Sequence, residues 1–445
     1  MKLPLALAAA TLCLIIASVA SSDQLALPNG MNVLVFESGA SDVCGVHLAL
    51  SIGPERVPPG KAGLRALTQQ IILSRIRAQM NTTESLASLR QEGTQGAGFS
   101  VETQDDCVEF TASVTSAQLK SLLEFLAPAV FAADWTQDDV VSAREIVLQK
   151  ANSPFGTGPE SGADDYIEAY RLFTHALLGD GPHTQPVFGT KETLEGITLA
   201  DVKSFYRSYY VPNLASLCVV GPVPARDVID LATAAFGAFE SRKVAPAAPV
   251  VQKQPRTRVQ VGESAALRMA VLVVGIPLPP VGTEGYAAGL ILNAALSGPG
   301  GSLAEDEGIA NLERSEGSGP KAPSGVLPVS VSHTPSLAII VGVMPTSVEE
   351  ARRLLLGKLA GLGEKPLADE ELARAKTRAI NLRILGMDEP RIAAATLNRR
   401  YLVTGEVGLE DPLIAQIAGL SAEAVQAVAA EQTKLHAIGL VMPGI

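Results

Sequence analysis

The chain has 445 residues, of which 47% are hydrophobic and 18% are charged, and its formal net charge is −11. Such a composition indicates a globular protein and excludes an intrinsically disordered one. The length exceeds what a single core usually holds, at ~150 residues per domain, and predicts two or three domains. An acidic balance without any basic run argues against nucleic acid or an anionic membrane as a partner.

The amino terminus carries the pattern of an export signal. Lys2 precedes an apolar run over residues 3–19, and the small residues Ser18, Val19 and Ala20 offer a cleavage site before Ser21. This arrangement predicts a signal peptide over residues 1–20 and a periplasmic or extracellular protein. An uncleaved membrane anchor is the alternative, because the run is nearly long enough to span a bilayer.

Three stretches come next in the chain, at residues 27–35, 51–56 and 60–64. Together they resemble the opening of the M16 family of zinc peptidases, which includes pitrilysin, insulinase and the mitochondrial processing peptidase. In that family a glycine-leucine pair, here Gly63-Leu64, leads into a helix with the motif His-x-x-Glu-His. The two histidines of this motif hold zinc and its glutamate activates the attacking water.

Carried onto this chain, the family motif has lost its chemistry. The two histidines fall on Ala66 and Gln70, and the glutamate falls on Gln69. Alanine has no donor atom, and a neutral amide is a poor zinc ligand and cannot act as a base. The third family ligand falls on Gln149 or Lys150, depending on the register of the helix over 142–150. The resemblance therefore implies a degenerate zinc motif, with no catalytic residue, no metal and no cofactor.

Three cysteines remain once Cys13 is removed with the leader, and none forms a Cys-x-x-Cys pair. Cys44, Cys107 and Cys218 all lie in strand-like segments, which predicts buried, inert thiols. A disulfide between Cys44 and Cys107 stays open for an exported protein if their strands are neighbours. His47 alternates with apolar residues in a strand and is predicted to be structural, while Glu109 has no partner that the sequence identifies.

The two halves of the chain contain corresponding elements. A capped helix after a strand at 115–126 recurs at 346–356, about 230 residues later. Strands followed by helices within each half predict an α+β fold. The resemblance implies two homologous M16-type (LuxS/MPP-like) domains, each an antiparallel sheet packed with helices, over residues 24–241 and 257–445. The proline-rich stretch at 242–256 is predicted to link them.

The second half also departs from the family in a place that handles substrate. The family has an arginine and a tyrosine there that hold the peptide, and the matching residues are Ala304 and Asn311. Alanine retains none of the grip of a guanidinium group. A glycine-rich stretch at 297–302 lacks the lysine of a phosphate-binding loop and is predicted to be an ordinary connection.

The resemblance implies a function without chemistry of its own. We expect a catalytically inactive subunit that is the structural or regulatory partner of an active zinc-dependent M16 peptidase, in an exported heteromeric complex that can share a peptide chamber. Two alternatives are a peptide-binding protein and a purely structural one, like the core subunits of the respiratory cytochrome complex. An active metalloendopeptidase is the least favoured reading. The sequence does not decide between a homo-oligomer and a hetero-oligomer.

Overall fold

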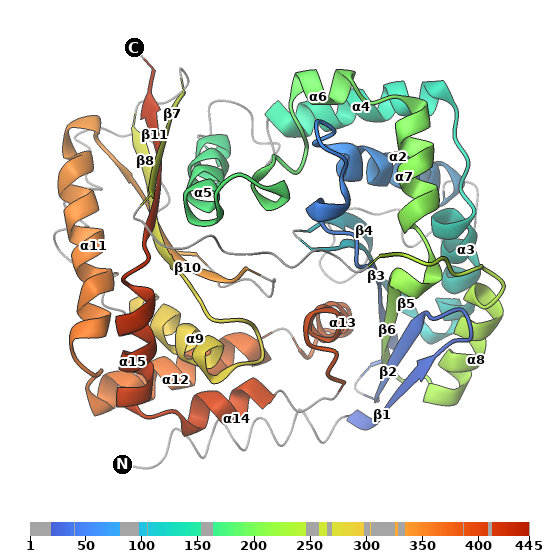
Figure 1. The fold of residues 1–445 in the computed structure, drawn as a ribbon. Coiled ribbons are helices and arrows are strands. Elements are labelled where there is room, and N and C mark those ends of the chain that lie inside the picture. Colours follow the sequence, from blue (N-terminus) through green and yellow to red (C-terminus); the bar gives the residue numbers. More distant parts are fainter. Residues whose placement is uncertain are drawn as a thin grey trace. The chain divides into compact units, whose positions relative to one another are not determined.

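The structure is a computed structural model that describes residues 19–39, 41–80, 98–104, 106–152, 163–245, 258–264, 269–297, 303, 325–327, 334–385, 387–407 and 412–444 (Figure 1). The chain forms two compact units, and neither is continuous in sequence. The first unit comprises residues 1–151, 185–248 and 384–410. The second comprises residues 152–184, 249–383 and 411–445.

The first unit is built on a six-stranded sheet with the strand order β1-β2-β6-β3-β5-β4. All neighbouring strands are antiparallel except β2 and β6, which run parallel. The predicted antiparallel sheet is therefore present except for this one parallel pair, which is possible because a long connection containing both strands and helices separates β2 from β6 along the chain. The strands are β1 (Val19–Ala26), β2 (Asn32–Ser38), β3 (Val43–Leu50), β4 (Gly98–Thr103), β5 (Val108–Thr115) and β6 (Ala215–Gly221).

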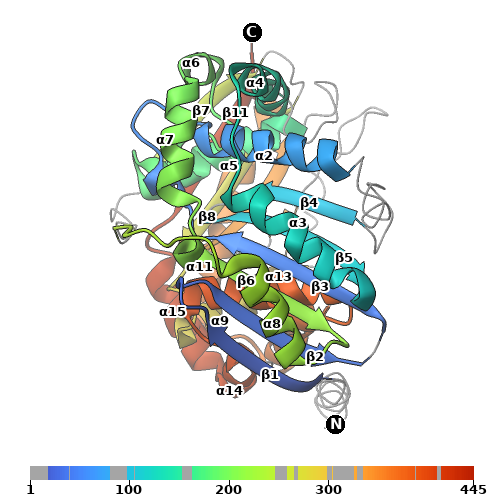
Figure 2. The same cartoon turned by 90° about the vertical axis from the view of Figure 1, so that its right-hand side faces the viewer.

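The helices of the first unit lie on both faces of this sheet. Figure 2 shows α3 and α8 on the near face, while α13 lies behind the strands. The near face is apolar because residues such as Val46, Leu48 and Phe110 alternate along their strands and join the largest buried cluster. The helices are α2 (Leu64–Met80), α3 (Leu119–Phe131), α4 (Gln137–Asn152), α6 (Lys191–Glu195), α7 (Leu199–Tyr209), α8 (Ala225–Phe236) and α13 (Pro390–Thr404).

The second unit repeats the plan with a five-stranded sheet in the order β7-β11-β8-β10-β9. It also has one parallel pair, formed by β7 and β11. Its strands are β7 (Arg258–Ser264), β8 (Ala270–Pro277), β9 (Gly325–Val326), β10 (Ser336–Val343) and β11 (Ala437–Pro443). Its helices are α5 (Ala163–Leu178), α9 (Glu284–Leu296), α11 (Val348–Glu364), α12 (Asp369–Ile384), α14 (Pro412–Gly419) and α15 (Ala422–Gln432). The α+β class and the two related domains are thus confirmed.

The two sheets exchange helices between the halves of the chain. Helix α5 comes from the first half but packs against β7, β8 and β11. Helix α13 comes from the second half but packs against β3, β5 and β6. The linear division at residues 24–241 and 257–445 therefore does not describe the compact units. Local sequence patterns cannot reveal such an exchange, because they report which face of a helix is apolar and not which sheet it covers.

Two predicted segments are described only in part. The predicted leader is described only at Val19 and Ala20, which begin β1. The predicted linker at 242–256 is described only over 242–245. Among the described residues, no single helix has the length and apolarity to cross a membrane, and the pair α14 and α15, bent by 101°, meets these criteria only when taken together.

Candidate functional site

Helix α2, which carries the degenerate motif, starts at a tightly packed glycine. Gly63 has φ +90°, and a Cβ there would lie 2.8 Å from the Phe188 carbonyl oxygen. Only glycine combines this backbone with such close packing, which explains why it precedes the helix. The first two turns of α2 are buried, including Arg65, Ala66, Gln69 and Gln70.

Gln69, at the position of the family's catalytic base, is held by hydrogen bonds to the sheet. Its amide nitrogen donates to the backbone oxygen of Glu102, and its amide oxygen accepts from the Thr103 hydroxyl. The adjacent Arg65 donates to the carbonyl oxygens of Ile52 and Gln104 at 2.7 and 2.8 Å. These bonds fix the start of α2 against β4, and they leave Gln69 as a structural group.

Gln70 and Lys150 meet where the family places its metal. The Lys150 ammonium donates to the Gln70 amide oxygen at 3.0 Å, across 80 residues of sequence. Gln70 also donates to the Ser74 hydroxyl at 3.2 Å. Gln149, which directly precedes Lys150 in α4, is exposed. The sequence left open whether Gln149 or Lys150 matches the third ligand of the family. In the structure it is Lys150 that contacts Gln70.

These residues do not fit a zinc ion. Ala66 offers only a methyl group, and the Lys150 ammonium places a positive charge against the one amide oxygen that faces it. Within the part of the chain that the structure describes, no three His, Cys, Asp or Glu side chains are grouped so that they could hold a metal. The geometry therefore supports no metal-assisted step at this position. Ala304 and Asn311 lie outside the described residues.

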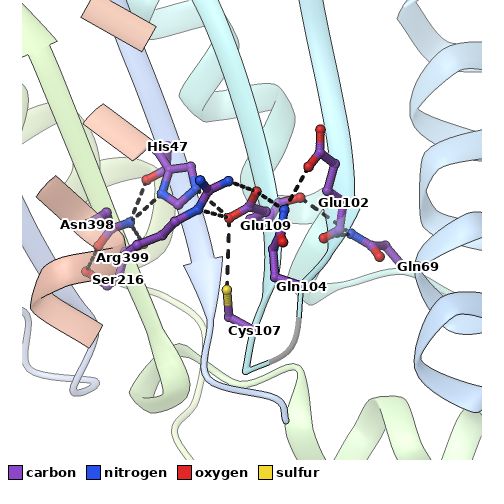
Figure 3. A network of polar contacts seen from close by, with 9 residues as sticks. All are labelled: His47, Gln69, Glu102, Gln104, Cys107, Glu109, Ser216, Asn398 and Arg399. Carbon is purple, nitrogen blue, oxygen red and sulfur yellow. Dashed lines mark hydrogen bonds and ion pairs between the residues drawn. The ribbon is translucent and has the colours of Figure 1, made fainter. Parts of the chain in front are cut away.

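A second polar group lies on the face of the first sheet that α13 covers (Figure 3). We call it the His47 cluster, and it consists of His47, Glu109, Ser216, Asn398 and Arg399. His47 Nε2 lies 3.1 Å from Glu109 Oε2, and both side chains are almost fully buried. Arg399 holds the same carboxylate with two nitrogens, Nε at 2.8 Å from Oε2 and Nη2 at Oε1.

Asn398 completes the His47 cluster from α13. Its amide nitrogen lies 2.9 Å from His47 Nδ1, 3.0 Å from the His47 carbonyl oxygen and 2.9 Å from the Ser216 carbonyl oxygen. Its amide oxygen accepts from the Ser216 hydroxyl at 2.6 Å. Every polar atom of this side chain is therefore satisfied in a fully buried place.

The electrostatics of the cluster keep Glu109 ionised and His47 neutral. Burial raises the pKa of Glu109, but the hydrogen bonds from His47 and Arg399 outweigh it and lower the pKa to about 2. Burial lowers the pKa of His47 from its usual 6.5, against the opposing influence of Glu109. The cluster thus holds one buried carboxylate paired with one guanidinium, and an uncharged imidazole between the carboxylate and Asn398.

Cys44, Cys107 and Cys218 are buried free thiols. Cys44 lies opposite Val114, whereas Cys107 precedes Val108, which lies opposite Leu50 at the other end of β3. The disulfide that the sequence left open is therefore absent, since bridged cysteines need Cβ atoms about 4 Å apart. Burial raises the pKa of Cys44 to about 11 and that of Cys107 to about 12, so both thiols are unreactive.

The sequence identified only part of this arrangement. It predicted His47 as structural, which its buried bonds confirm, but it assigned no partner to Glu109. A signal was present, because Glu109 interrupts the apolar strand Val108–Thr115 and a buried carboxylate needs a cation. The cation could not be named, since Arg399 lies 290 residues further along the chain.

Comparisons with known proteins point to the M16 family. The family model described as "Peptidase M16 inactive domain" matches residues 196–379. An uncharacterised zinc protease of Streptomyces coelicolor is 26% identical over 269 residues, which are 58% of this chain and 56% of that protein. The chain thus spans little more than half of this relative.

Solved structures show the same fold. A protease from Helicobacter pylori matches with a TM-score of 0.78 and 18% identity, over 96% of this chain and all of that chain. A chain of complex III from Candida albicans matches with a TM-score of 0.76 and 14% identity, over 95% of this chain and 96% of that chain. At identities this low, the similarity shows a shared fold and does not show a shared activity.

Proposed function

This chain belongs to the M16 peptidase family, and we propose that it is a member without peptidase activity that serves as the partner of an active zinc-dependent M16 peptidase in an exported complex. The contact between the Lys150 ammonium and the Gln70 amide oxygen carries the proposal. It supports the loss of the metal site, because the ammonium group of Lys150 lies where an active member would hold a cation.

The surrounding bonds support a site that is built for structure. Gln69 is engaged by two strands, and Arg65 is engaged by two backbone carbonyls, so neither side chain is aimed at a substrate. These contacts satisfy buried polar groups that would otherwise destabilise the fold. A framework kept for its fold is expected if the scaffold itself serves an assembly.

The loss of chemistry is tested on the purified chain. Metal analysis after dialysis is expected to find no stoichiometric zinc, and unstructured peptides are expected to stay uncleaved. The matched variant combines Ala66→His, Gln69→Glu, Gln70→His and Lys150→Glu, which rebuilds the family motif and is expected to gain about one zinc per chain. One tightly bound zinc in the unaltered chain, or chelator-sensitive cleavage by it, would overturn the proposal.

The partner role is tested separately, by co-expression with an M16 chain that has an intact His-x-x-Glu-His motif. We expect the two chains to elute together in size-exclusion chromatography and the activity of the partner to depend on this chain. The control is the same partner with the glutamate of its own motif replaced, which must form the complex but lose activity. Independent elution with unchanged partner activity would eliminate the partner role, and would leave the absence of peptidase chemistry intact.

A further inference from the structure

Helix α13 is attached to the first sheet by a small apolar contact and by the His47 cluster. The apolar contact joins Ala393, Ala394 and Leu397 to a few strand residues, among them Leu34 and Phe36. Tyr401 of the same helix is partly buried against this apolar contact. The polar bonds of Asn398 and Arg399 add directed contacts that fix the position of α13 on the sheet.

The orientation of Asn398 is fixed independently of His47. Its amide nitrogen faces the carbonyl oxygens of His47 and Ser216, and its amide oxygen faces the Ser216 hydroxyl. Turning the amide over would set its oxygen against two backbone oxygens in a buried place, which is strongly unfavourable. The amide nitrogen thus shares its two hydrogens among three acceptors, and His47 Nδ1 faces a hydrogen-bond donor and no acceptor of Asn398.

His47 can accept that hydrogen bond only while it is neutral. Its Nε2 donates to Glu109 Oε2 at 3.1 Å, so Nδ1 has to remain free of a proton to accept from Asn398 at 2.9 Å. Protonation would put an N–H on Nδ1, and two donors would then face each other. We propose that the His47 cluster is an acid-sensitive latch, which holds α13 on the first sheet while His47 is neutral and releases it when His47 takes up a proton.

The described groups around His47 do not remove this conflict. Strand β5 contributes Glu109, whose charge is already matched by Arg399 of α13. Strand β6 places the Cys218 thiol opposite His47, and burial raises the pKa of that thiol, so it stays neutral. Glu102 of β4 favours a proton on His47, but only as a more distant charge, while Arg399 opposes it. The added cation would thus remain without a partner of its own.

The direction of the pH dependence follows from the pKa of His47. It is lowered in the folded protein from the ordinary 6.5, because the ring is fully buried. The open form therefore takes up a proton near pH 6.5, before the closed form does. The contribution of the latch is complete above about pH 6.5 and is lost as the pH falls from there toward the folded pKa. Glu109, with a pKa of about 2 in place of 4.5, protonates in a separate and more acidic window.

Hydrogen exchange on the full chain between pH 7.5 and 5.0 tests the latch, after correction for the intrinsic pH dependence of exchange. We expect the protection of α13 amides to fall about tenfold for each pH unit below ~6.5, since one proton is linked to opening. Amides of β3 and of α5 serve as internal references and should keep their protection. If α13 and β3 lost protection together, or if α13 kept it down to pH 5.0, the proposal would be wrong.

The matched variants are His47→Gln and His175→Gln. A glutamine at 47 retains one donor and one acceptor but does not titrate, so α13 should lose its pH dependence over this range. His175 lies in the second unit and bonds Asp180, so its replacement should leave the α13 profile unchanged. An identical pH profile in His47→Gln and in the unaltered chain would also refute the latch.

A second measurement keeps the test decisive if His47→Gln does not fold. The imidazole signals of the unaltered chain can be followed by NMR through the same pH range, with His47 assigned by replacing each of the other four histidines in turn. The release of α13 should coincide with the titration of His47. Release without any change of the His47 signal would overturn the proposal.

Discussion

Helices α5 and α13 each cover one face of a sheet that belongs mainly to the other half of the chain, but they are attached by different chemistry. Beneath α5 the sheet carries glycines, and a Cβ on Gly439 would lie 2.0 Å from the Ala169 carbonyl oxygen. Its buried contacts are apolar, with Phe173 fully buried against the strands. Beneath α13 the sheet also has one such glycine, Gly45, but next to it lies the His47 cluster.

The difference shows two ways to make the same exchange of helices. The contact of α5 depends on close approach between backbones and contains no titratable group among the buried residues of its apolar cluster. The contact of α13 depends on a satisfied polar network, which specifies one position of the helix but responds to protonation. We therefore expect both contacts to be sensitive to added volume, at Gly439 and at Gly45, and only the α13 contact to be sensitive to lost polar partners and to acid.

The largest effect is expected from adding one methyl group beneath α5. Gly439→Ala should lower the free energy of unfolding by about 3 kcal/mol or more, because the new Cβ meets backbone atoms that cannot move aside. Denaturant unfolding measures this change. Gly357→Ala is the control, since its Cβ meets nothing within 4 Å and a helical alanine is favourable. Equal stability of the two variants would contradict the close backbone contact.

A smaller loss is expected from removing Asn398 on α13. Asn398→Ala at pH 8 should lower the free energy of unfolding by about 2–3 kcal/mol, because it leaves His47 Nδ1 and the Ser216 hydroxyl buried without a partner. Thr404→Ala is the matched control on the same helix, since its hydroxyl donates to the Arg400 carbonyl oxygen and accepts from the Glu406 amide, and neither group belongs to the sheet. A cost no larger than that of the control would show that the apolar contact alone holds the helix.

Sequence reasoning succeeds where the determinants are local. The capping pair of Thr115 and Gln118 marks the start of the helical segment, although a 3-10 turn precedes α3. Likewise Gly63 directly precedes α2 and has the positive φ that favours glycine. The loss of the zinc motif is visible in the sequence itself, at Ala66, Gln69 and Gln70.

The sequence fails where residues far apart must meet. Asn398 and His47 are 351 residues apart, and nothing near either one specifies the other. Asn398 lies in a helix with several polar residues, and only its contact with β3 and β6 distinguishes it from a solvated side chain. The exchange of α5 and α13 has the same origin, because a period of 3.6 residues defines an apolar face but not the sheet that receives it.

The smallest effect is expected from the contact between Lys150 and Gln70, which is as polar as the His47 cluster but lies partly in solvent. Water competes for an ammonium group there, so the double-mutant cycle of Lys150→Met and Gln70→Ala should give a coupling energy below about 1 kcal/mol. The corresponding cycle of Glu109→Gln and Asn398→Ala joins two groups that both contact the buried His47 ring, and it should give a larger coupling. Both cycles are measured by denaturant unfolding at pH 8, where His47 is neutral. A coupling energy between Lys150 and Gln70 above that of the His47 cluster would mean that burial does not decide the strength of these polar contacts. The attachment of α13 through a buried polar network would then have no energetic advantage over an exposed contact.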